Sequence, residues 1–223
     1  YGPAMNIHRS AFAGRNFEYY SEDGVLSGYM AANEMNGAAV KGVYPYIKHF
    51  ALNDQETNRC SFLLTFASEQ TIREGYLKAF ELAVKGFEGN AIAAMSSFNW
   101  IGTVPSCANN GLLGFVGMVE TDYDGSYGYM ITDHCIRNGN DLMLGFNSAE
   151  SNKLTDESAT AVLAMRQACK NILYTVANSG YYADGNPAAG MSNMTKLFVT
   201  VDVILAVLLI VADAIVIVPF RKK

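Results

Sequence analysis

The alternation of short apolar strands with helical stretches is the feature that most limits the folds open to this chain. The predicted strands are 42–50, 91–99, 114–123 and 141–146. The predicted helices are 68–86, between the cap Ser68 and the stop Gly86, then 126–139, and 155–180 with Thr155 as cap and Gly180 as stop. Apolar strands that alternate with helices are typical of a parallel sheet covered by helices, so the predicted class is α/β.

The composition excludes several classes of protein. With 223 residues, half of them apolar and 17% charged, the chain is long enough for one large folded domain. Its formal charge of -5, without a Lys or Arg run before the last three residues, argues against a nucleic-acid partner. The four cysteines are widely spaced and form no CxxC pair. We interpret them as buried free thiols, and we predict neither a disulfide nor a metal site at Cys60, Cys107, Cys135 or Cys169.

The stretch 197–220 differs in kind from the rest of the chain. Its 24 residues are interrupted only by Asp202 and Asp213, and the basic sequence RKK follows. About 20 apolar residues cross a bilayer as a helix, and basic residues mark the cytoplasmic end. We therefore predict a transmembrane helix at 197–220, a cytoplasmic end at 221–223, and a single-pass protein of the cell membrane with its folded domain outside the cell. We interpret the two acids as tolerated near the interfaces, with a polar helix–helix contact as the alternative.

Polar residues follow the ends of three predicted strands. Lys48 and His49 end the first, Ser96, Ser97 and Asn99 end the second, and Asp122 ends the third. The carboxyl ends of parallel strands are where TIM-type barrels and open α/β sheets hold their active sites. We expect these side chains to face one pocket, with the glycines after Asp122 letting the chain turn at its rim.

Four motifs carry a resemblance to a known family. They are GRNFEYYSED at 14–23, YIKHFALNDQETNR at 46–59, MSSFNWIG at 95–102 and GFVGMVETDYDGSYG at 114–128. In this order they resemble glycoside hydrolase family three, in particular its β-glucosidases, over about residues 1–175. The resemblance implies a partial TIM-type (β/α) barrel at 1–178, and the loop 179–196 is predicted to be a linker.

The resemblance also implies a site. Asp122, in the tripeptide Thr121-Asp122-Tyr123, matches the nucleophile that forms a covalent glycosyl-enzyme intermediate; a carboxylate can attack the anomeric carbon and then leave. Residues that match the sugar-binding set are Arg15, Lys48, His49, Arg59, Met95 as a pocket wall, Phe98 in place of a usual Tyr, and Tyr123 in place of a stacking Trp. Such charged donors are also expected to keep Asp122 ionised.

A structural interpretation stands beside each functional one. Without the motif, Lys48 and His49 are a surface pair, and Arg15 pairs with Glu18 or Glu22 at a helix start. Met95 and Phe98 are more often core residues than pocket residues. Glu120 and Asp124 are interpreted as supporting or rim acids, since Glu120 shares the face of Asp122 but lies one pleat repeat deeper.

The sequence departs from the family in two places. A retaining mechanism needs a second carboxyl about 5 to 5.5 Å from the first, and in the family it lies in a separate α/β sandwich domain. We expect that domain, and the first barrel strands, to precede Tyr1, as in bacterial members whose two domains occur in swapped order. The family also has a helical segment between NNGLL and GFVGMV, and here the two run together. We expect a thinner helix layer there.

The predicted function is therefore retaining hydrolysis of terminal, non-reducing β-D-glucosyl residues through Asp122, with the acid/base Glu outside this chain. A β-xylosidase stays open within the enzyme class. The alternative is a non-catalytic, membrane-anchored barrel fragment or sugar-binding remnant. The predicted partners are a β-glucoside or oligosaccharide, the membrane and the upstream sandwich domain. No cofactor is implied, because the sequence has no GxGxxG or Walker loop.

Overall fold

The computed structural model describes residues 1–113, 117–123, 128–145 and 153–180, together with 200, 201, 203–205 and 207. It divides into two compact units, Tyr1–Ala183 and Asp184–Lys223. Both sheets, and all helices from α1 to α6, belong to the first unit. The predicted boundaries of the segments 1–178, 179–196, 197–220 and 221–223 stay predictions.

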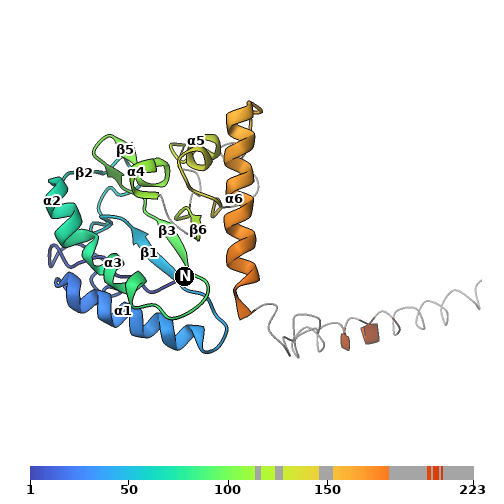
Figure 1. Cartoon of the computed structure of the whole chain (residues 1–223), viewed down its shortest axis with the longest axis horizontal. Coiled ribbons are helices and arrows are strands. Elements are labelled where there is room, and N and C mark those ends of the chain that lie inside the picture. Colours follow the sequence, from blue (N-terminus) through green and yellow to red (C-terminus); the bar gives the residue numbers. More distant parts are fainter. Residues whose placement is uncertain are drawn as a thin grey trace, which may run out of the picture. The chain divides into compact units, whose positions relative to one another are not determined.

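A parallel sheet lies at the centre of the first unit (Figure 1). Its strands β1 (Tyr46–Phe50), β3 (Ala93–Ser96) and β6 (Met118–Glu120) are hydrogen-bonded in the order β1-β3-β6. Isolated parallel bridges, Ala4 with Lys48 and Glu120 with Leu142, extend the sheet on both sides. The predicted α/β class is confirmed, but the strands are shorter than predicted. The strand expected at 141–146 is reduced to the bridge at Leu142, and residue 146 lies outside the described residues.

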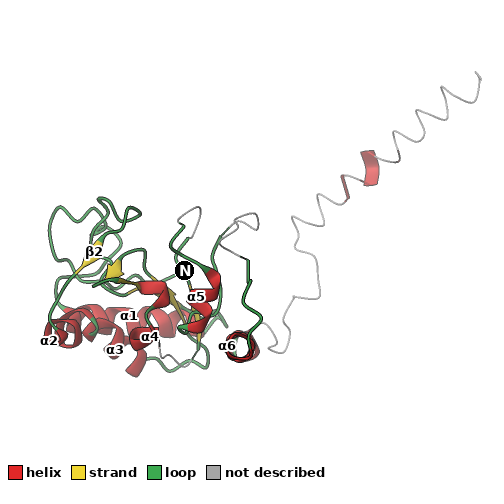
Figure 2. Ribbon diagram, turned by 90° about the horizontal axis from the view of Figure 1, so that it is seen from above, coloured by secondary structure: helices red, strands yellow, loops and turns green. Residues whose placement is uncertain are grey.

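Helices cover one face of this sheet, as Figure 2 shows. The described helices are α1 (Gly24–Ala39), α2 (Glu69–Thr71), the π-helical turn η1 (Ile72–Tyr76), α3 (Lys78–Lys85), the 3-10 turn η2 (Ser106–Ala108), α4 (Asn110–Leu113), α5 (Thr132–Arg137) and α6 (Ala159–Ala177). Ser68 caps α2 as predicted, since its hydroxyl accepts from Thr71 N. The cap of α6 is Ser158 rather than Thr155, because Thr155 bonds to Asp133 instead.

For helix α1 the sequence predicted only a helix start, at the acids Glu18, Glu22 and Asp23, and not the helix that follows. Asp23 begins it by accepting hydrogen bonds from the N–H groups of Val25 and Leu26. Apart from Met35, its buried face is made of small side chains, which give no clear apolar stripe in the sequence. Gly28 allows the close contact with α3, because a Cβ at Gly28 would lie 2.9 Å from the carbonyl oxygen of Ala79.

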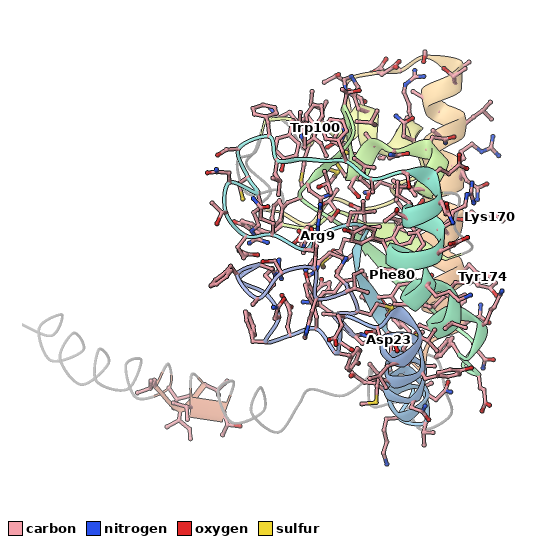
Figure 3. The ribbon with its side chains drawn as sticks, turned by 90° about the vertical axis from the view of Figure 1, so that its left-hand side faces the viewer. Arg9, Asp23, Phe80, Trp100, Lys170 and Tyr174 are labelled. Atoms are coloured by element: carbon pink, nitrogen blue, oxygen red, sulfur yellow. The ribbon has the colours of Figure 1, made fainter. Side chains whose placement is uncertain are left out.

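The apolar core lies between the sheet and the helices. Paired residues of neighbouring strands point to the same face, so Ile47, Ala94 and Val119 form one row beneath the helices. Phe80 of α3 packs into the same cluster, and its ring lies 5.0 Å from that of Phe50. In Figure 3, Phe80 lies behind α3 on the helical side of the molecule. This row orients the sheet, because it leaves the other face to polar residues.

A small second sheet follows the carboxyl ends of the main strands. Strand β4 (Trp100–Ile101) pairs in parallel with β2 (Leu64–Thr65) and antiparallel with β5 (Val104–Pro105). Trp100 lies within the motif 95–102 and Leu64 lies five residues after Arg59, so this sheet holds loops that carry site residues.

The described strands form no closed barrel. Three parallel strands and two bridges leave both sheet edges open, whereas a TIM barrel needs eight tilted strands. Between β3 and β6 the longest helix among the described residues is the four-residue α4. A groove of about 310 Å³ lies on the helical face of the sheet at that place, and its walls include Ile47, Phe80, Ala94, Leu113 and Val119. The thin helix layer expected here agrees with this groove.

The predicted membrane span is corrected by the structure. Within the described part of the chain, no helix combines the length and the apolar character that crossing a bilayer requires. The prediction of a single-pass membrane protein, with membrane as partner, is corrected on this finding, because no described helix supplies the span. Most of 197–220, all of 221–223 and most of 179–196 lie outside the described residues.

The four cysteines are free, as predicted. Cys107 and Cys135 are buried and Cys60 is half-buried, whereas Cys169 is exposed on α6. The prediction of buried thiols is therefore wrong for Cys169. Its helix turns that position away from the core, where Ala168 packs instead.

Candidate functional site

The Asp122 carboxylate lies just beyond the last residue of β6. Its backbone N–H donates to the carbonyl of Ser96 over 3.0 Å, which ties the residue to the end of β3. One carboxylate oxygen, Oδ1, accepts a hydrogen bond of 2.8 Å from the N–H of Tyr123. The other, Oδ2, is buried and has no hydrogen-bond partner among the described residues. One oxygen is thus fixed and the other is left for a reaction partner.

His49 is fully buried beside this oxygen, with Nε2 3.6 Å from Oδ2 of Asp122. Burial, followed by the charges of Arg15, Lys48 and Arg59, holds the pKa of His49 well below its usual range. Arg15 donates to Nε2 over 3.1 Å, so we assign the imidazole proton to Nδ1, 3.2 Å from the Tyr19 hydroxyl. A neutral His49 makes no ion pair with Asp122.

Three cations surround the two residues, and each is paired with an acid. Arg15 contacts Glu18 and lies 3.1 Å from Glu56, whose other carboxylate oxygen is 3.2 Å from Arg59. Lys48 lies 3.4 Å from Glu18. The Nη1 atom of Arg15 is buried without a partner among the described residues. Among the described residues, the site therefore holds a buried donor, Arg15 Nη1, and buried acceptors, with Asp122 Oδ2 among them, that have no hydrogen-bond partner and that a ligand could satisfy.

The pKa of Asp122 reflects opposing effects. Burial raises it, while the hydrogen bond from Tyr123 N and the charges of Arg59, Arg15 and Lys48 lower it. The net direction is upward, because desolvation is the largest effect. The expected role of the cations in favouring the carboxylate is real but is outweighed by burial in the unliganded chain.

The three remaining predicted site residues lie in different surroundings. Met95 is buried and pairs in register with Glu120. Phe98 is buried against Cys107, Met130 and Cys135, and the Arg59 guanidinium lies 4.4 Å from its ring centroid. Phe98 is only 3% exposed, so it lies beneath Arg59 and does not line an open wall. Tyr123 is 39% exposed, which leaves much of its ring accessible.

Glu120 lies deeper on the same strand. The Tyr1 hydroxyl donates to its Oε1 over 3.4 Å, and Oε2 has no partner among the described residues. Burial raises the pKa of Glu120 to about 7, against a lowering by the Tyr1 hydrogen bond. A buried carboxyl with this pKa is half protonated near neutral pH.

The loop 51–62 follows Lys48 in the chain and carries Arg59, and its backbone is strained at three residues. Leu52, Asn58 and Phe62 have φ angles of 60°, 61° and 60°, the left-handed region that non-glycine residues seldom adopt. Such conformations concentrate at functional sites, where neighbouring contacts hold them. Glu56 and Arg59 of this loop face the site through their ion pairs with Arg15 and with each other.

The chain is similar to β-glucosidases. No family model matches it. It is 44% identical over 128 residues to a β-glucosidase of Ruminococcus albus, an alignment that covers 55% of this chain and 13% of that protein. β-Glucosidase 3B of Thermotoga neapolitana, solved in complex with glucose, superposes with a TM-score of 0.67 and 34% identity over 80% of this chain and 27% of that one. A family-three (GH3) β-glucosidase of Bifidobacterium adolescentis superposes with a TM-score of 0.64 and 28% identity over 83% of this chain and 28% of that one.

The chain is a homologue of the family-three β-glucosidases. The fold likeness over 80% of the chain and the identity over 128 residues confirm the resemblance that the four motifs indicated. The homologue spans 13% of the length of the Ruminococcus albus relative. Because it is so much shorter than that relative, its own activity and substrate are matters for proposal.

Four residues of the β-glucosidase homologue belong to the site but were not predicted for it. They are Glu18, Tyr19, Asn53 and Glu56. Glu56 had a local signal, since it lies three residues before Arg59 in ETNR. Glu18 also had one, since it lies three residues after Arg15. Tyr19 and Asn53 had none, because their partners are far away in the chain. The pair of Arg15 with Glu18, which was the structural interpretation of Arg15, is present in the structure. Arg15 also lies beside His49, so both contacts occur together.

Proposed function

We propose that the chain carries the nucleophile half of a retaining β-glucosidase site. Oδ2 of Asp122 attacks the anomeric carbon of a terminal β-D-glucosyl residue, and the bond from that carbon to the aglycone oxygen breaks, with the electron pair leaving on the oxygen. Water then releases glucose and frees the carboxylate. The observation that supports this most is the buried, unpartnered Oδ2 beside neutral His49 and three cations.

The other residues hold the sugar in this proposal. Arg15 Nη1 is a buried donor without a partner among the described residues, and it suits a sugar hydroxyl. Lys48 and Arg59 are half-buried cations that can donate to neighbouring hydroxyls. His49 fixes Arg15 by accepting its hydrogen bond. Met95 forms a wall, Phe98 supports Arg59 from below, and the exposed ring of Tyr123 stacks on the sugar.

The acid/base group is assigned to a segment outside these 223 residues, in the sandwich domain that the family carries. A retaining enzyme needs that carboxyl about 5 to 5.5 Å from the nucleophile. Glu18 and Glu56 are held in ion pairs, and Glu120 lies one pleat repeat below Asp122. None of these three is placed to protonate a leaving group above the sheet edge. Glucose is the proposed sugar because the relatives are named β-glucosidases and one neighbour was solved with glucose.

A mechanism-based label tests the nucleophile without the missing acid. The chain is incubated with 2,4-dinitrophenyl 2-deoxy-2-fluoro-β-D-glucoside, whose phenolate leaves without protonation. We expect the intact mass to rise by one fluoroglucosyl group and the peptide containing Asp122 to carry it. Asp122→Asn is expected to remain unlabelled, with Glu120→Gln as the matched control that is still labelled.

Two further outcomes would change the proposal. Faster labelling by the matching fluoroxyloside would move the substrate from a β-glucoside to a β-xyloside. Glucose binding seen by saturation-transfer NMR, with no label on the native chain, would contradict catalysis and leave a sugar-binding remnant.

A further inference from the structure

A buried carboxyl on the side of β6 away from β3, that of Asp141, has no role in the proposed hydrolysis. The residue is 6% exposed. Its Oδ2 accepts a hydrogen bond of 2.8 Å from the N–H of Val119, and its Oδ1 accepts one of 3.0 Å from the side-chain amide of Asn171 on α6. Because both oxygens are bonded inside the protein, Asp141 acts on the fold near Asp122 and not on a substrate.

Asp141 binds both backbone groups of Val119. Besides the N–H bond to the carboxylate, the carbonyl of Val119 accepts from the N–H of Asp141 over 2.7 Å and from that of Leu142 over 3.1 Å. A hydrogen bond to a charged acceptor is about twice as strong as one between neutral groups. We name the contacts of the Asp141 carboxylate and N–H with Val119 the clasp. The clasp fixes β6 three residues before Asp122.

The residue next to Asp122 is bonded to the same segment. The N–H of Thr121 donates to the carbonyl of Leu142 over 2.9 Å, and its buried hydroxyl accepts from the N–H of Leu144 over 2.8 Å. On the other side, the N–H of Asp122 donates to the carbonyl of Ser96 on β3. The nucleophile end of β6 is therefore held between β3 and the segment that the clasp attaches to it.

Strand β6 needs this support because of its place in the sheet. It has three residues and ends the order β1-β3-β6, and among the described residues a single bridge at Leu142 continues the sheet beyond it. A strand at an edge has backbone groups without ladder partners, and buried ones must be bonded by other groups. Figure 1 shows β6 between β3 and α6. Helix α6 contributes Thr175, whose hydroxyl accepts from Met118 N over 3.1 Å, and Asn171, which holds the Asp141 carboxylate.

We propose that Asp141 is a positioning residue, whose clasp on Val119 sets the place of the Asp122 carboxylate for attack on the sugar. This inference rests on the proposed function, because attack by Asp122 is the step that the clasp serves. A displacement of about 1 Å at a reacting group can cost about a hundredfold in rate. The cations that hold the sugar come from the segments 14–23 and 46–59. Loss of the clasp therefore slows the attack and leaves sugar binding in place.

The test measures fluoroglucosyl labelling of the full chain at a series of reagent concentrations. This separates the maximal labelling rate from the concentration that gives half of it. Asp141→Ala is expected to lower the maximal rate about ten- to a hundredfold and to change the half-maximal concentration by less than about threefold. Asp141→Asn keeps an oxygen for Val119 N and can donate to a flipped Asn171 amide, so its maximal rate should recover to within about threefold of the native rate.

Thr175→Val is the matched control. It also removes a buried hydrogen bond to β6, at Met118 N, but it leaves the clasp intact, so its maximal rate should stay within about threefold of the native rate. Asn171→Ala is a second variant, at a partly buried helix position, for the case that Asp141→Ala does not fold. It removes one of the two bonds that orient the carboxylate and should lower the maximal rate about three- to tenfold. Circular dichroism checks that each variant is folded.

Amide hydrogen exchange tests the clasp without the label. We expect Asp141→Ala, and not Thr175→Val, to speed exchange at the N–H groups of Thr121 and Asp122 about tenfold or more relative to those of α3. Unchanged exchange at these two groups, or a native maximal rate in folded Asp141→Ala, overturns the positioning role and leaves the proposed function standing. Equal losses of rate in Asp141→Ala and Thr175→Val also overturn it, since a general loss of stability would explain both. A native chain that takes no label overturns the proposed function, and the catalytic purpose of the clasp with it.

Discussion

Two carboxyls at the end of β6, Glu120 within the strand and Asp122 just beyond it, show how depth in the sheet changes the chemistry of a group. Both point to the face opposite the helices, both are buried, and burial raises the pKa of each. Asp122 lies beyond the last paired residue of β6, where three cations converge from distant segments. Glu120 lies within the ladder, paired with Met95, and its hydrogen bond comes from Tyr1. The outer carboxyl therefore meets cationic side chains that favour its reactive form.

The largest expected effect separates the two carboxyls directly. Asp122→Asn removes the nucleophile in the proposed mechanism, so the rate of fluoroglucosyl labelling should fall by about a thousandfold or more. Glu120→Gln should change that rate by less than about threefold, because it does not touch the sugar. Time-resolved intact-mass measurement checks both. Equal losses in the two variants would show that depth does not distinguish them.

The second test concerns the support beneath Asp122. Tyr19→Phe removes the hydroxyl that lies 3.2 Å from His49 Nδ1 and donates to the Asn53 carbonyl over 2.7 Å. Buried polar groups left unsatisfied cost about 1 to 3 kcal/mol, so the free energy of unfolding in urea should fall by that amount. Tyr20→Phe, at a more exposed hydroxyl that bonds Glu34, should cost less than about 0.5 kcal/mol. If the free energy of unfolding of Tyr19→Phe equals that of the native chain, the contact between Tyr19 and His49 does not stabilise the fold.

The pH dependence of stability should identify Glu120. Its pKa is about 7 in the folded chain and 4.5 for the free side chain, so the folded state binds the proton more tightly. The contribution of Glu120 to the free energy of unfolding is at its maximum below about pH 4.5 and is lost as the pH rises to about 7. After allowance for partial solvent screening, we expect a loss of about 1 to 2 kcal/mol.

The free energy of unfolding in urea is measured at about pH 4.5, 5.5 and 7.5. Glu120→Gln should remove the pH-dependent contribution of Glu120 from it. Burial also raises the pKa of Asp141, to about 6. Because Asp141 is present in both the native chain and Glu120→Gln, its contribution cancels when the two free energies of unfolding are subtracted. Identical pH slopes in the native chain and in Glu120→Gln would contradict the raised pKa of Glu120.

The smallest expected effect comes from Tyr1. Its hydroxyl stabilises the charged form of Glu120 through a long hydrogen bond of 3.4 Å, which lowers the pKa of Glu120. Tyr1→Phe should therefore raise the midpoint of the Glu120 titration, by less than about half a pH unit. Carbon-13 NMR of the glutamate carboxyls measures it, and a midpoint that falls would contradict the assigned contact.

The sequence predicted the parallel α/β class and brought attention to Lys48, His49, Arg59 and Asp122, because each stands in a short local motif. It predicted the start of helix α1 but not its course, because the buried face is mostly small residues and packs closely against α3 at Gly28. It also failed at 197–220, where hydropathy suggested a membrane span that no described helix provides. Tyr19 and Asn53 escaped notice because their contacts join distant residues.

By itself the sequence determined which side chains could act, since a carboxylate after an apolar strand and basic residues after another are local facts of the chain. Only the tertiary structure decided their states: the neutral His49, the single unpartnered oxygen of Asp122 and the support of Phe98 beneath Arg59. The physical reason is that pKa values and hydrogen-bond partners depend on burial and on neighbours brought together by folding, and neither is encoded in adjacent residues.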